Sequence, residues 1–174
     1  MRLLTDDARI EKNPPEMVRF ATHLPVFDLQ VVSRWGAMAY EHVVDEVGWV
    51  GLRITPGTPL PRWWFVSRIE GHGLDDGVNG FRDGALALFD ASPREALPGI
   101  PFLIRGSFTD PELGAYTVRL ISRIGEGRIV LTSLNPDRSQ FPDILVDASH
   151  ADSVHLVARV VQPLLSQYRP LDSR

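Results

Sequence analysis

The sequence predicts a mostly β domain made of short antiparallel strands. Three features predict it: short runs rich in β-branched and aromatic residues, alternation with a period of two inside several of these runs, and turn-forming pairs between them. The alternation is clearest over Ala115–Ile124, where every second residue from Tyr116 onward belongs to one face of a strand. Many short strands at such spacing are typical of a β barrel or a β sandwich.

The first part of the chain, residues 1–24, is predicted to be an N-terminal arm. It begins with charged residues and then carries Pro14-Pro15 and a stretch long enough for only one or two helical turns. A single short helix does not make a helix-turn-helix, which needs two packed helices. We therefore expect an arm over residues 1–24, the β domain over residues 25–164 and a C-terminal tail over residues 165–174.

Each predicted strand is an apolar run bounded by turn formers such as Pro56-Gly57, Asp83-Gly84, Pro98-Gly99 and Asn135-Pro136. In chain order the predicted strands cover Val26–Val32, Trp49–Ile54, Trp63–Ile69, Ala85–Ala91, Phe102–Phe108, Ala115–Ile124, Gly127–Leu134, Asp143–Ala148 and Val154–Val161. A little further helix is expected only over Ala151–Leu156 and after Pro163.

The composition excludes several classes of protein. The chain has 174 residues, a length that suits one domain, and its 44% hydrophobic content is ordinary for a globular protein. It has no cysteine, so disulfide, thiolate-metal and cysteine-nucleophile chemistry are excluded. A net charge of −4 argues against direct nucleic-acid binding. No apolar run has the length of a membrane span or a signal peptide, so we expect a cytoplasmic protein that does not bind membranes.

The residues that could carry chemistry give no metal or cofactor motif. The five histidines lack the spacing of a zinc site, so we expect no metal and no cofactor. The glycine-rich stretch Glu70–Gly84 lacks the phosphate-loop lysine and is acidic. The tryptophans could stack on bases, but few basic residues lie among them, which favours a core or an interface. Of 18 basic residues, only Lys12 is a lysine.

Several segments follow one another in an order that resembles a known family. VVSRWGAMAYEHVVDEVGWV (Val31–Val50) is similar to a cleavage-site region, Phe65–Asp90 to a nucleophile strand with its following turn, and Ala115–Ile121 to a strand that carries a catalytic lysine. Ile129–Val146 and Val154–Val161 are similar to the closing strands. In this order the chain resembles the regulatory domain of LexA and UmuD, the self-cleaving serine peptidases of the bacterial SOS response. The resemblance implies a signal-peptidase-like β barrel.

The same resemblance implies an active site whose two reacting groups are missing here. The position of the serine falls on Gly73, flanked by His72, Leu74 and Asp75, and the position of the lysine falls on Arg119. A Ser–Lys dyad needs an amine that burial can hold neutral, whereas a guanidinium keeps its proton in proteins.

The cleavage region is changed as well. Trp35 precedes Gly36 and Ala37, where the family has a small residue. A bulky indole would fit poorly in a pocket shaped for alanine.

We therefore expect a catalytically inactive relative that acts in protein binding or assembly, in a bacterial regulatory or defence complex. Its expected partners are another protein or a second copy joined through the C-terminal strands, with nucleic acid involved only indirectly. One alternative is an active serine hydrolase or self-cleaving peptidase with rearranged residues, for which Ser67 and His72 are the candidates. A second alternative is an accessory subunit associated with nucleic acid.

Overall fold

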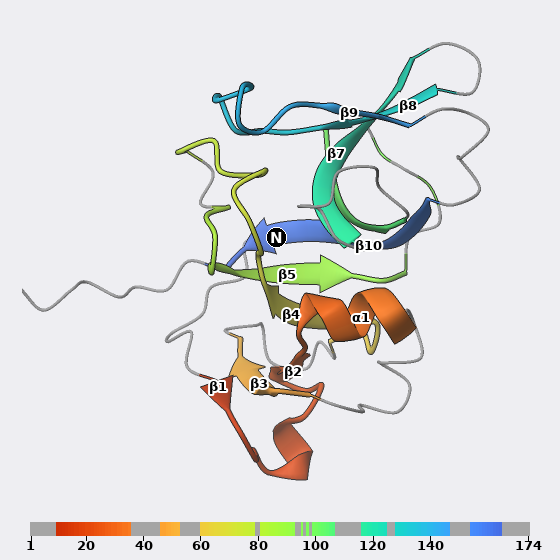
Figure 1. The fold of residues 1–174 in the computed structure, drawn as a ribbon. Helices are drawn as coiled ribbons and strands as arrows, with labels where there is room; N and C mark the ends of the chain where they lie inside the picture. The colour runs from red at the N-terminus through yellow and green to blue at the C-terminus, as the bar shows by residue number, and fades with distance from the viewer. Residues whose placement is uncertain are drawn as a thin grey trace, which may run out of the picture.

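Ten short strands join into one sheet in the order β1-β3-β2-β4-β5-β10-β6-β7-β8-β9 (Figure 1). The computed structural model describes residues 10–35, 46–52, 60–78, 81–92, 95, 97, 99–106, 116–124, 128–146 and 154–164. The strands are β1 Ile10–Glu11, β2 His23–Val26, β3 Gly48–Gly51, β4 Trp64–Arg68, β5 Leu86–Asp90, β6 Pro101–Arg105, β7 Tyr116–Ile124, β8 Arg128–Thr132, β9 Ile144–Val146 and β10 His155–Pro163, with the 3-10 helix η1 Glu16–Val18 and the helix α1 Leu29–Trp35. No described helix is long and apolar enough to cross a membrane.

The prediction of a mostly β domain is confirmed. Every predicted run from Trp49 onward contains a strand, and the strand pairs are antiparallel except for β2 beside β4. The run Val26–Val32 is the exception, because β2 ends at Val26 and α1 begins at Leu29. The carbonyl of Asp28 accepts the backbone N–H bonds of Val31 and Val32, which starts the helix. Leu29 and Val32 are three residues apart and both buried, so this apolar spacing is helical rather than strand-like.

The predicted closed barrel is not formed. In the described part of the chain, the sheet ends at β1 and β9, which contain two and three residues and pair on one side only. The first half of β7 pairs with β6 and its second half with β8, with Leu120 as the residue shared by both pairings. In the same way β10 pairs with β6 up to Arg159 and with β5 from Arg159 onward. The sheet therefore bends where a strand changes partner, and its two end strands do not pair with each other.

The predicted N-terminal arm is wrong for residues 10–24. Ile10 of β1 and Leu24 of β2 both face Val50 of β3, one from each side. Leu24 and Val50 are fully buried and Ile10 packs against their cluster. These residues belong to the sheet because their side chains complete one of its apolar faces.

Strands β4 and β5 and helix α1 pack together in the core. Phe65 of β4 and Phe89 of β5 lie opposite each other with stacked rings whose centroids are 4.9 Å apart. Leu29 and Val32 of α1 join the same cluster, and Figure 1 shows α1 lying across this part of the sheet. The segment that follows β4 therefore leaves from a rigid base.

β10 lies inside the sheet, between β5 and β6. Only Arg159 pairs with both neighbours, because the pairing with β6 ends at this residue and the pairing with β5 begins there. The expected joining of two copies through the C-terminal strands stays a prediction. The only stretch of β10 without a strand beside it on the β6 side, within the described residues, follows Arg159.

Candidate functional site

The segment after β4 is fixed where it leaves the sheet. Ile69 donates its N–H to the Ala85 carbonyl and accepts the Gly84 N–H, each at 2.8 Å. Gly71 donates its N–H to Oδ1 of Asp83 at 2.8 Å and has a φ of 78°, which suits glycine. These bonds set the direction in which the next two residues run.

Residues 72 and 73 lie along the chain that leaves β8. The carbonyl of Gly73 accepts the N–H of Leu134 at 2.7 Å and the hydroxyl of Ser133 at 2.8 Å. The carbonyl of His72 accepts Nδ2–H of Asn135 at 3.0 Å. Segments 60 residues apart in sequence are thus joined side by side.

Gly73 and Arg119, the two positions singled out by the sequence, meet in the structure. Arg119 lies on β7 opposite Phe102 and is 5% exposed. A Cβ atom added to Gly73 would stand 2.8 Å from Cζ of Arg119 and 3.0 Å from its Nε and Nη1. Arg119 also interacts with a further group. The guanidinium therefore occupies the space that a side chain at position 73 would need.

This arrangement does not provide a nucleophile and its base. Gly73 has no hydroxyl, and a guanidinium is a donor that does not take up a proton. The neighbouring hydroxyl of Ser133 already donates to the Gly73 carbonyl. The fully buried Ser67 donates to the Phe27 carbonyl at 2.6 Å, while the exposed His72 places its ring 5.9 Å from that of Phe141. Ser67 and His72 thus do not form the hydrogen-bonded pair that the hydrolase alternative needs.

The other predicted site residues are spread over different surroundings. Leu74 is 1% exposed and belongs to the core. Asp75 accepts the Gly77 N–H through Oδ1 at 3.1 Å, so its carboxylate faces its own loop. Trp35 is the last residue of α1, whereas Gly36 and Ala37 lie outside the described residues. Of the predicted cleavage-site region Val31–Val50, residues 31–35 are helical and residues 48–50 belong to strand β3.

Two ionisable groups near this region have shifted pKa values. Burial raises the pKa of Tyr116, and the hydrogen bond that its hydroxyl donates to Oε2 of Glu70 at 2.5 Å raises it further. Burial also acts to raise the pKa of Asp90, but hydrogen bonds from Ser92 and the charge and hydrogen bonds of Arg159 outweigh it, so the pKa lies below its usual value. Nη2 of Arg159 lies 2.6 Å from Oδ2 of Asp90, which is 2% exposed in its side chain.

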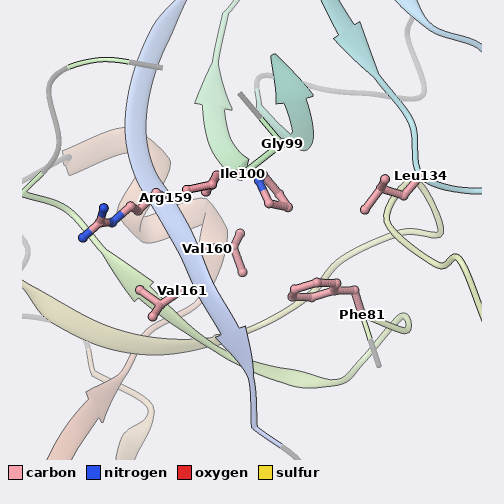
Figure 2. Close-up of a pocket in the computed structure, with 8 residues that line it drawn as sticks. Phe81, Gly99, Ile100, Leu134, Arg159, Val160 and Val161 are labelled. Atoms are coloured by element: carbon pink, nitrogen blue, oxygen red, sulfur yellow. The ribbon is translucent and has the colours of Figure 1, made fainter. Parts of the chain in front are cut away.

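A hollow of about 570 Å³ lies beside β10 (Figure 2). Leu134 connects it to the candidate site, because its N–H holds the Gly73 carbonyl while the residue also lines the hollow. Figure 2 shows the guanidinium of Arg159 directed away from Phe81 and Leu134. The charged group of Arg159 therefore does not lie against these two apolar side chains of the hollow. The hollow is lined by Phe81, Gly99, Ile100, Pro101, Leu134, Arg159, Val160 and Val161.

Sequence reasoning missed Ser133, Leu134 and the hollow. The Asn135-Pro136 pair signalled a turn after β8, but no local pattern indicates that the residues before this turn bind a carbonyl 60 positions earlier. In the described ranges, no group of three or more histidine, aspartate or glutamate side chains is placed to hold a metal ion. Scans against models of known protein families and against curated proteins find no match for this chain.

Proposed function

We propose that this chain is a non-catalytic protein-binding module with a LexA-type peptidase-like fold, acting in the cytoplasm as part of a regulatory or defence complex. The contact between Gly73 and Arg119 carries the proposal. The two positions that a Ser–Lys dyad would occupy lie against each other, and they hold a residue without a side chain and a permanent cation. A site that keeps this proximity without the reacting groups can still hold a peptide.

The hollow supports a binding role and indicates how a partner would dock. β6 and β10 pair as far as Phe102 opposite Arg159 and separate beyond that point. Val160 and Val161 then border the hollow on the side where β6 has left. A hollow of this volume, lined mainly by apolar side chains, falls in the size range of ordinary ligand sites.

An extended segment of a partner protein suits this hollow. A strand edge offers backbone groups for β addition, and apolar walls accept every second side chain of an added strand. The partner expected here is therefore a protein with an exposed extended stretch in which apolar residues alternate with others.

The test is selection of a displayed library of random peptides on the purified chain. Peptides that share alternating apolar positions should be enriched and should lose binding to Val161→Asp. Val161 is 38% exposed, so the substitution should leave the fold intact. Leu145→Asp is the matched control, because Leu145 is 58% exposed on β9 and does not line the hollow. Enriched peptides that bind Val161→Asp as well as the parent chain, or no enrichment at all, would contradict the proposed docking.

A further inference from the structure

We infer that Arg19 and Trp49 form a binding site for a carboxylate group. Trp49 lies on β3, and Arg19 follows η1 in the short connection to β2. These elements belong to the end of the sheet order opposite β9, so this site is separate from Gly73 and from the hollow. The inference does not depend on the proposed function.

Two buried N–H donors in this corner have no acceptor among the described residues. Trp49 is 1% exposed, and its Nε1 makes no hydrogen bond within the described structure. The same is true of Nε of Arg19. Cζ of Arg19 lies over the Trp49 ring at 5.2 Å from the centroid, so the two donors belong to side chains in contact. Buried donors are nearly always paired in proteins, so two orphans in one contact point to an acceptor that occupies the site.

The backbone at Phe20, next to Arg19, has a conformation that is unfavourable for residues other than glycine. Phe20 has a φ of 56°, and no other described residue except glycine has a positive φ. It is fixed by its N–H bond to the His23 carbonyl at 2.8 Å and by the Leu60 N–H bond to its own carbonyl at 3.0 Å. Its ring meets Trp49 edge-on, with the centroids 5.3 Å apart. Strain of this kind is concentrated at functional sites, and here it falls on the residue whose ring contacts the indole beside Arg19.

A carboxylate has the shape and charge that these donors require. It is planar and offers two acceptor oxygens to the edge of a guanidinium, and the orphan Nε of Arg19 is one of the two nitrogens on that edge. The indole N–H is a further donor for the same group, and a neutral carbonyl would leave the cation without a counter-charge. The carboxylate of Glu11 is directed elsewhere, with its Oε1 3.6 Å from Nε2 of His23. The ligand is therefore a carboxylate from outside this corner.

The experiment follows the indole N–H resonances of the ¹⁵N-labelled full chain during titration with sodium acetate. The chain has four tryptophans, and the Trp49 signal is the one lost in Trp49→Phe, which keeps the aromatic ring under Arg19. Acetate should shift this signal in a saturable way, whereas acetamide, its neutral isostere, should not. Arg19→Gln should abolish the response, and Arg19→Lys should weaken binding by about tenfold, because lysine keeps the charge but loses the planar fork.

Further arms identify the source of the carboxylate. A short peptide with an aspartate side chain and blocked ends is compared with one whose only carboxylate is its C-terminus, and the stronger binder shows which group a partner offers. The inference is overturned if acetate leaves the Trp49 signal unchanged, as it would if a buried water satisfied both donors. It is also overturned if acetamide acts equally, if Arg19→Gln responds like the parent chain, or if inorganic phosphate binds more tightly than acetate.

Discussion

Replacing Gly73 by alanine should destabilise the fold through Arg119. The new methyl group would stand 2.8 Å from Cζ and 3.0 Å from Nε and Nη1, well inside van der Waals contact. Overpacking of this kind costs about 1 to 3 kcal/mol. Gly73 is not among the glycines with a positive φ, so alanine should otherwise stabilise the chain by about 0.4 to 1 kcal/mol through the unfolded state. The net expected loss is about 1.5 kcal/mol, equivalent to about 4 °C in Tm for a domain of this size.

Urea unfolding followed by far-ultraviolet circular dichroism measures this loss in two backgrounds. Arg119→Ala removes every side-chain atom beyond Cβ, so the cost of Gly73→Ala in that background should fall below about 0.5 kcal/mol. Gly71→Ala is the control. Gly71 has a φ of 78° and nothing within 4 Å of an added Cβ, so its cost of about 1 kcal/mol should be the same in both backgrounds. An equal cost of Gly73→Ala with arginine and with alanine at position 119 would refute the contact.

Three further variants test the surroundings of the site. Ser133→Ala removes the hydroxyl that holds the carbonyl of residue 73, and should cost about 1 to 2 kcal/mol in urea unfolding; no loss would mean that the bond is unimportant. The lowered pKa of Asp90 means that the hydrogen bonds from Ser92 and the pair with Arg159 stabilise the fold above about pH 4, and that this contribution is lost as the pH falls through the lowered pKa. Asp90→Asn should therefore cost about 2 kcal/mol at neutral pH and less as the pH falls below about 4, and a cost independent of pH would contradict the pairing. The raised pKa of Tyr116 means that the contribution of its bond to Glu70 is present below about pH 10 and is lost as the pH rises further. In ultraviolet titration one tyrosine should ionise later than the others, and Tyr116→Phe should remove that late component.

The mostly β architecture could be predicted because strand alternation and turn pairs are local signals. Tyr116 to Ser122 alternate in sequence, and β7 covers this run. The helix α1 was missed because Leu29 and Val32 fit a short apolar strand as well as a helical turn when only seven residues are considered. Periodicity alone does not distinguish the two in so short a run.

Local sequence patterns do not predict which segments, far apart in sequence, lie side by side in the fold. Nothing within Val154–Val161 indicates that β10 inserts between β5 and β6. The positive φ of Phe20, the partners of Ser133 and the orphan donors of Trp49 likewise depend on segments far away in sequence. The order of motifs along the chain, rather than any periodicity, singled out Gly73 and Arg119 as a pair. The structure places them in contact, and the role assigned to them stays a prediction.

Intact mass spectrometry of the purified chain tests most directly whether the site formed by Gly73 and Arg119 cuts its own polypeptide. The protein is incubated for days at steps between about pH 7 and about pH 10, a range over which an amine base would lose its proton. A single unchanged mass near 19.4 kDa at every step is expected. Two fragments whose masses sum to that of the intact chain plus one water molecule, with a break near Trp35 and Gly36, would contradict the account.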